Sequence, residues 1–217
     1  MNFKMFRELS IIKTLIMNIN YFGIKSIFHP KILCSKNVVI KEMKGKIIFN
    51  SLHENTRLKL GFNSIGCFDE KRESTVFQNR GEIIIMGTAS LSSGTKLSNS
   101  GTIVFGNNFA ISGNTTIICA KRIEFGDNCL ISWDCLFMDT DLHDVLGLDG
   151  EKKNNSTPII IGDNVWFGCR CTTTKGTIIS KNNIVAANSR LHGNYSMENC
   201  CIGDNGVIIK RNVTWKK

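Results

Sequence analysis

The chain has 217 residues, 42% of them hydrophobic and 21% charged, which is the composition of a folded protein with a buried core. Polar residues interrupt its most apolar stretch, near the N-terminus, so we predict neither a membrane-spanning helix nor a secretory signal and expect a cytoplasmic protein. The nine cysteines contain no CxxC pair and are predicted to be reduced residues that fill small spaces in the core.

The net charge of +9 is concentrated near the N-terminus. Residues 1–50 contain nine Lys or Arg against Glu8 and Glu42. No nucleic-acid-binding motif accompanies this charge, so we do not expect a nucleic-acid partner. A solvated surface, or a peripheral contact with the anionic inner face of a membrane, explains the charge better.

Residues 1–33 are predicted to form a basic amphipathic helical segment, followed by a second unit over residues 34–217. The helix should end by His29, because Pro30 disfavours helical backbone in the residue before it. Apolar residues recur every three or four positions and therefore share one face of this helix: Leu9, Ile12, Ile16, Ile19 and Phe22. We expect this face to dock on the rest of the chain; the alternative is a surface that also touches lipid.

After Gly45 the sequence becomes a series of short apolar runs separated by Gly and Asn. Three runs, GEIIIMG, GTIVFG and RIEFG, repeat an isoleucine every 20 residues, at Ile83, Ile103 and Ile123. A finer period of six contains Ile85, Leu91, Leu97 and Ile103; Phe105, Ile111, Ile117 and Ile123; Phe125, Ile131 and Phe137; and then Ile161, Phe167, Thr173, Ile179, Val185 and Leu191. A smaller residue follows many of these four positions later: Ala89, Thr95, Thr115, Cys129, Cys135, Val165, Cys171, Thr177 and Ser189.

A period of six fits neither a helix nor a hairpin sandwich, but it fits a triangular coil with one short strand on each side. The aliphatic residues should point inward, the small residues should let the next corner close, and Gly, Asn or Asp should form the corners. Such coils bury their apolar residues only when they stack, so we predict a mainly β solenoid with one continuous core. Residues 138–158 interrupt the period and are predicted to protrude as a loop.

Two sequence runs resemble a known group of enzymes. The period of six, LISWDCLFMDTDLH (residues 130–143) and PIIIGDNVWFG (residues 158–168) are similar to the left-handed parallel β-helix acyltransferases of the galactoside and serine acetyltransferase type. The resemblance covers roughly residues 36–217 and is strongest for the O-acetyltransferases of capsule and exopolysaccharide. The left hand of the coil is implied by the resemblance alone, because the general rule for parallel crossovers predicts the opposite hand.

The resemblance implies that an acetyl group moves from acetyl-CoA to a hydroxyl of a saccharide, with His143 on the loop as the general base. A sugar hydroxyl must lose its proton as it attacks the thioester, and an imidazole, with an ordinary pKa of about 6.5, can accept that proton. Asp139 and Asp141 are both near enough in sequence to orient the imidazole, and the sequence does not choose between them. No metal is implied.

The resemblance also implies a donor site and a homotrimer with sites between subunits. Trp166 is expected to line the groove for acetyl-CoA, Cys169 and Ala187 to meet it through backbone groups, and Lys210 and Arg211 to bind the nucleotide phosphates. The chain departs from relatives at ANSRLHGN (residues 187–194) and IGDNGVIIK (residues 202–210), where groups that contact the phosphates are lost.

Three other functions are weighed against this prediction. The same scaffold can transfer an acyl group to the nitrogen of an amino sugar, or serve as a non-catalytic structural solenoid. A metal-dependent carbonic anhydrase would need three histidine ligands assembled between subunits, and only His143 and His192 lie in suitable coils. The sequence does not identify the acceptor.

Overall fold

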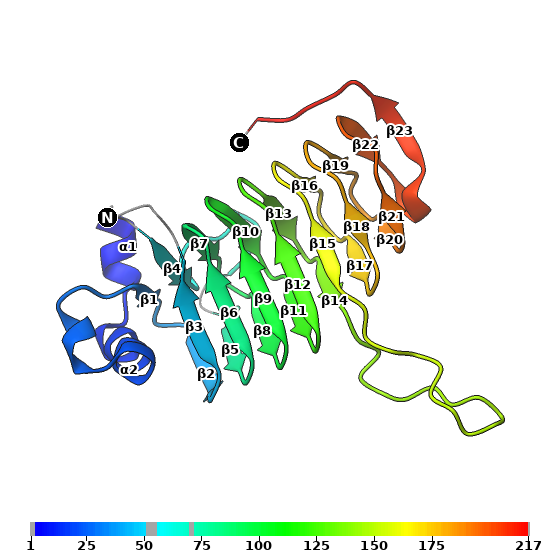
Figure 1. Ribbon diagram of the computed structural model, residues 1–217. Coiled ribbons are helices and arrows are strands. Elements are labelled where there is room, and N and C mark those ends of the chain that lie inside the picture. Colours follow the sequence, from blue (N-terminus) through cyan, green and yellow to red (C-terminus); the bar gives the residue numbers. More distant parts are fainter. Residues whose placement is uncertain (1–2, 51–55, 70–71, 217) are drawn as a thin grey trace.

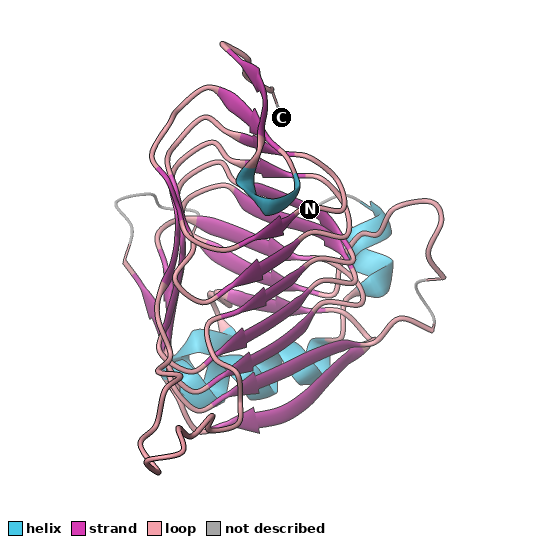
Figure 2. Ribbon diagram, turned by 90° about the vertical axis from the view of Figure 1, so that its right-hand side faces the viewer, coloured by secondary structure: helices cyan, strands magenta, loops and turns pink. Residues whose placement is uncertain are grey.

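The computed structural model describes residues 3–50, 56–69 and 72–216, and shows a triangular solenoid of β-strands with a helical cap at its N-terminal end (Figure 1). The strands form three sheets, one on each side of the prism, and the coils stack one behind another along it (Figure 2). The fold is a left-handed parallel β-helix, as predicted. The helical elements of the described residues are α1 (Phe3–Glu8), α2 (Ile11–Phe22) and two short 3-10 turns, η1 (Ile24–Ile27) and η2 (Asp204–Gly206).

Each sheet takes one strand from each complete coil, and one sheet also contains β22 and β23. We name the three sheets after β16, β17 and β15. The β16 sheet has the order β1 (Ile32–Cys34), β4 (Arg57–Leu60), β7 (Thr88–Leu91), β10 (Phe109–Gly113), β13 (Leu130–Trp133), β16 (Trp166–Phe167), β19 (Ile184–Val185), β22 (Cys200–Ile202) and β23 (Ile208–Arg211). The β17 sheet has the order β2 (Val38–Met43), β5 (Thr75–Asn79), β8 (Lys96–Asn99), β11 (Thr116–Cys119), β14 (Leu136–Met138), β17 (Thr172–Thr174) and β20 (Arg190–Leu191). The β15 sheet has the order β3 (Lys46–Phe49), β6 (Glu82–Ile85), β9 (Thr102–Phe105), β12 (Arg122–Phe125), β15 (Ile159–Ile161), β18 (Ile178–Ile179) and β21 (Asn194–Tyr195).

The predicted periods are the register of these sheets. Ile83, Ile103 and Ile123 are direct partners on β6, β9 and β12, one coil apart. The neighbouring strands pair in parallel except β22 and β23, which are antiparallel and form the last described pair of the β16 sheet. The chain therefore folds back on itself at the C-terminal end, where a parallel coil would continue the solenoid.

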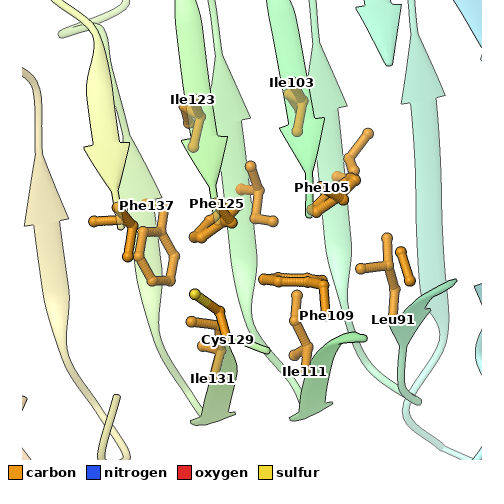
Figure 3. Close-up of a cluster of buried hydrophobic side chains, with 14 of the residues drawn as sticks. Leu91, Ile103, Phe105, Phe109, Ile111, Ile123, Phe125, Cys129, Ile131 and Phe137 are labelled. Carbon is orange, nitrogen blue, oxygen red and sulfur yellow. The ribbon is translucent and has the colours of Figure 1, made fainter. Parts of the chain in front are cut away.

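The core is a column of inward residues that the sequence predicts. Every residue of the six-residue series, and every small residue four positions later, is buried. Aromatic side chains extend the column through the middle coils: the rings of Phe105 and Phe125 stack 5.8 Å apart, and Phe137 meets Phe125 edge-on at 5.0 Å (Figure 3). Such contacts stabilise a coil only when its neighbour is in place, so the coils are expected to fold cooperatively.

Glycine and asparagine form the corners. A Cβ atom on Gly81 would lie 2.0 Å from the carbonyl oxygen of Gly101 in the next coil, so the coils can approach only because this side chain is absent. Asn108 and Asn128 adopt left-handed backbone with φ of 56° and 58°, and their side chains hydrogen bond at 2.9 Å from one coil to the next. Asn tolerates this conformation better than most residues, which explains its abundance at the corners.

The N-terminal helices cap the first coil. Asn18 accepts hydrogen bonds through Oδ1 from the backbone N–H groups of Lys31, at 2.8 Å, and Ile32, at 3.1 Å, while its Nδ2 donates to the carbonyl of Ile32. Thr14 Oγ1 accepts from the N–H of Cys34 at 3.1 Å. Polar groups on the edge strand β1 that would otherwise be open to another chain are thus occupied by α2.

The docking face of α2 differs from our prediction. The helix ends at Phe22, before His29 as expected, but it docks through Thr14, Met17 and Asn18, all buried. The predicted face points outward at three of its members, Ile12, Ile16 and Ile19, which are exposed. The reason is that the edge of β1 needs hydrogen-bonding partners, and only the polar side of α2 supplies them. No helix of the described residues is long and apolar enough to cross a membrane.

The cysteines are free, as predicted, and most belong to the core. Six are buried: Cys34, Cys119, Cys129, Cys135, Cys171 and Cys200. Burial raises the pKa of the Cys34 thiol to about 12, which keeps it protonated and unreactive at neutral pH. Cys67, by contrast, is exposed.

One inward position departs from the apolar pattern and gives a test of the core. Thr173 is fully buried between Phe137 and Leu191, its apolar partners in the neighbouring coils, and its Oγ1 has no hydrogen-bond partner among the described residues. We expect Thr173→Val to stabilise the protein by about 1 kcal/mol, raising Tm by about 2–4 °C, because a buried hydroxyl without a partner is removed. Thermal unfolding followed by circular dichroism measures the change.

Thr177→Val is the matched control. Thr177 is also fully buried, but its Oγ1 donates to the carbonyl of Thr174 at 2.7 Å. This variant should lower Tm, because it removes the hydrogen bonds from the Thr177 hydroxyl to the carbonyls of Thr174 and Leu191. Equal shifts for the two variants would contradict the assignment of Thr173 as an unsatisfied core hydroxyl.

Candidate active site

The insertion leaves the solenoid after β14 and returns at β15, at the corner between the β17 and β15 sheets. It extends away from the body of the molecule as a long loop (Figure 1). Its distal part is a short hairpin, in which Gly147 N donates to the carbonyl of Glu151 and Lys153 N donates to the carbonyl of Val145. His143 lies at the base of this hairpin and is exposed.

Asp141 is joined to the His143 segment through Asn154. The Nδ2 of Asn154 donates to Asp141 Oδ2 at 2.6 Å and to the backbone carbonyl of His143 at 2.8 Å. Lys175, in the turn after β17, forms an ion pair with Asp141, and this ammonium together with Asn154 lowers the pKa of Asp141 below its ordinary value. The carboxylate therefore stays charged at neutral pH and holds the base of the loop against the next coil.

Asp139 has a different role. Its carboxylate is fully buried and accepts hydrogen bonds from three backbone N–H groups of the turn into β12, those of Ala120, Lys121 and Arg122, at 2.7, 2.8 and 2.7 Å. It thus holds that turn, one coil earlier, and not the imidazole. Of the two aspartates considered from the sequence, Asp141 is the one connected to His143.

The predicted donor residues lie on another side of the prism. Trp166, on β16, points outward, and its direct partners along the β16 sheet are Ile184, then Cys201, then Lys210. With strands about 4.8 Å apart, this row extends about 14 Å from the indole to Lys210. Ile184 and Cys201 between the two ends are half-buried and apolar. The row offers an aromatic ring, an apolar track and a positive charge in succession.

The remaining donor residues flank this row. Cys169 and Ala187 lie one coil apart at the corner that follows β16 and β19, and the Cys169 carbonyl is already occupied by the N–H of Asn188 at 2.9 Å. Arg211 adjoins Lys210 on β23, and both are exposed. The structure therefore brings all five predicted donor residues to the β16 sheet or its adjacent corner.

Trp215 is a neighbour of the row that our sequence analysis missed. After β23 the chain runs back over the β16 sheet (Figure 1), and the Trp215 ring lies 6.0 Å from that of Trp166, tilted by 42°. Its Nε1 donates to the carbonyl of Asn164 at 2.8 Å, while Trp166 Nε1 donates to Ser132 Oγ at 3.1 Å. No motif or period marks Trp215, nor Asn154 and Lys175, because their partners are far away in sequence.

His143 and Trp166 are not brought together within one chain. The insertion leaves from the corner between the β17 and β15 sheets, whereas Trp166 lies on the β16 sheet. Both views place the loop and the C-terminal tail on opposite sides of the solenoid (Figures 1 and 2). The described residues contain no group of three or more His, Cys, Asp or Glu that could hold a metal ion.

Comparison with known proteins identifies the fold. No protein-family profile matches the chain, and no curated protein sequence matches it. Among solved structures, the polySia specific acetyltransferase NeuO has a TM-score of 0.55 and 17% sequence identity, over 84% of this chain and 90% of NeuO. The polysialic acid O-acetyltransferase OatWY has a TM-score of 0.47 and 23% identity, over 86% of this chain and 87% of OatWY. The likeness to NeuO confirms the parallel β-helix.

The two aspartates give a test of the site's internal division. Asp139→Ala should lower Tm by at least about 6 °C, because three backbone N–H groups lose their buried acceptor at a cost of about 1–3 kcal/mol each, and each kcal/mol shifts Tm by about 2–4 °C in a chain of this size. His143→Ala should change Tm by no more than about 2 °C, because the side chain is exposed. Calorimetry of the two variants measures this; equal losses of stability would contradict a structural role particular to Asp139.

Proposed function

We propose that the protein transfers an acetyl group from acetyl-CoA to a hydroxyl of a saccharide, with His143 as the general base. The observation that carries the proposal is the exposed histidine at the base of the hairpin of the insertion, together with the row from Trp166 to Lys210. NeuO, which shares the fold, is an acetyltransferase specific for polysialic acid, and this supports a saccharide acceptor.

The chemistry requires one proton acceptor and a bound thioester. The imidazole of His143 takes the proton of the acceptor hydroxyl while the oxygen attacks the thioester carbonyl. The carbon–sulfur bond then breaks, and the departing CoA sulfur takes the proton from the imidazolium. Asp141 and Asn154 do not touch the reacting atoms; they hold the backbone of His143 and act as positioning residues.

The donor fits the row on the β16 sheet. The apolar track between Trp166 and Lys210 suits an extended pantetheine arm, with the thioester at the indole and the phosphates near Lys210 and Arg211. Trp215 covers the Trp166 ring and would form a second wall at the thioester end.

Two parts of the proposal concern the surroundings of the enzyme. It acts as a homotrimer in which His143 of one chain faces Trp166 of another, because a single chain separates them. Leu142, Val145, Leu146 and Leu148 on the insertion are exposed, which suits a loop that packs on a neighbouring copy. The enzyme also works at the inner face of a membrane, as a peripheral protein.

The general base is tested by His143→Ala. Acetyl transfer should fall by about a hundredfold or more, the usual effect of removing a general base, while the Kd for CoA stays within about threefold. Asn154→Ala, the matched positioning variant, should lose less activity because the imidazole remains. CoA release is followed by chromatography over a screen of saccharide acceptors, and CoA binding by thermal shift.

Other outcomes would identify the alternatives. Transfer by His143→Ala above about a tenth of the wild-type rate would contradict the assignment of the base. A wild-type protein that gains no thermal stability from CoA would favour the non-catalytic solenoid. A product that resists mild alkali would indicate an amide, and so transfer to the nitrogen of an amino sugar.

Mixed oligomers test the shared site. His143→Ala and Trp166→Ala should each be nearly inactive alone, but trimers reassembled from an equal mixture should regain about a quarter of the wild-type sites, since His143 and Trp166 then come from different chains. The control is an equal mixture of wild type with a chain that carries both substitutions. It measures how far inactive chains dilute the wild-type sites. No recovery in the first mixture, or a monomer by light scattering, would contradict the proposal.

A further inference from the structure

The N-terminal cap exposes an apolar helix face. Ile12, Ile16 and Ile19 of α2 are 71%, 47% and 39% exposed. Their spacing of four and three residues places them on one face of the helix, on the side away from the buried Thr14, Met17 and Asn18. The isoleucine side of α2 is therefore only partly covered by the described part of this chain.

Further large apolar residues of the cap are exposed with them. They belong to α1, to the start of α2, and to η1 and its end: Phe6, Ile11, Ile24 and Phe28. Monomeric soluble proteins seldom expose so many large apolar side chains in one short segment. We call these four residues and the three isoleucines the apolar cap surface. It lies at the end of the solenoid opposite β23 (Figure 1).

Positive charge accompanies the apolar cap surface. Seven of the nine net positive charges of the chain belong to residues 1–50. Where burial is described, the exposed basic residues of the cap and the first coil are Arg7, Lys25, Lys31, Lys36, Lys41, Lys44 and Lys46. Glu42, one of the two acidic residues of this region, is neutralised by ion pairs with Lys44 and Arg80.

This combination selects one occupant. A second copy of the cap would bring two like-charged surfaces together, which opposes association. An anionic lipid surface would instead attract the lysines and bury the isoleucines at the boundary of headgroups and acyl chains. The charge complementarity therefore favours a membrane over a dimer of caps.

We propose that the apolar cap surface is a membrane-binding site, in which the exposed face of α2 inserts between anionic headgroups and the basic residues of the cap and the first coil contact their phosphates. This inference rests on the proposed peripheral location of the protein and is independent of acetyl transfer. It orients the solenoid with its N-terminal end on the bilayer and with β23, at the other end, away from it (Figure 1).

Sedimentation with vesicles tests this site. The probe is the full-length protein with vesicles of phosphatidylcholine alone or of an equal mixture with phosphatidylglycerol. We expect wild type to bind the anionic vesicles at least about tenfold more tightly, and the affinity to fall as salt rises. The variant Ile12→Ser/Ile16→Ser/Ile19→Ser should lose about tenfold or more. Its Tm should fall by no more than about 6 °C, because surface substitutions change stability by about 0.5 kcal/mol each.

Val207→Ser/Ile209→Ser is the matched control. It removes exposed apolar residues at the other end of the solenoid and should bind vesicles as wild type does. Equal binding of wild type to both vesicle types, or wild-type binding by the triple variant, would overturn the proposal. A wild type that binds no vesicles but loses an oligomer in the triple variant would identify the cap as an interface between copies.

Acetyl transfer and membrane binding can be tested independently of each other. Acetyl transfer to a soluble acceptor without vesicles should be equal in wild type and the triple variant, whereas His143→Ala should bind vesicles normally. A loss of vesicle binding therefore does not contradict the proposed acetyl transfer, and a loss of acetyl transfer does not contradict the proposed membrane-binding site.

Discussion

The structure depends on the stacking of each coil on its neighbours. A coil of short strands has too little apolar surface to be stable alone, and its inward residues are buried only because the coils on either side cover them. The ring contacts that link Phe105, Phe125 and Phe137 are all between successive coils or within one corner, and the glycine corners allow these coils to approach. Three further parts of the described chain are attached to this column. The cap covers one end, β23 covers the other, and the insertion leaves from one corner.

A column of this kind positions functional groups by register. Trp166, Ile184, Cys201 and Lys210 are far apart in sequence but form a straight row, because parallel strands in register place equivalent side chains side by side. The insertion is not part of the sheets. Asn154 and the ion pair of Asp141 with Lys175 hold it near its base instead. The proposed site thus combines a rigid donor track with a loop that reaches a different molecule.

The strand edges at the two ends of the solenoid are covered in different ways. An open strand edge invites association with other chains. At the C-terminal end the chain itself turns back as β23, whereas at the N-terminal end α2 covers β1 with Thr14 and Asn18. The use of the polar side of α2 for this purpose leaves its isoleucines outside. The membrane-binding surface that we propose is therefore a direct consequence of how the first strand is capped.

The sequence by itself determined the solenoid, its inward residues and the place of the insertion, because a period of six is a local signal that every coil repeats. It also indicated His143 and the donor residues, through motifs that lie within short runs. Only the tertiary structure decided which aspartate is connected to His143, which face of α2 docks, and that Trp215 covers Trp166. Each of these depends on a contact between distant segments: Asp139 with the turn one coil earlier, Thr14 and Asn18 with the edge of β1, and the C-terminal tail with β16. Hydrophobic spacing cannot predict such contacts, since it records which residues prefer burial and not which backbone groups need a partner.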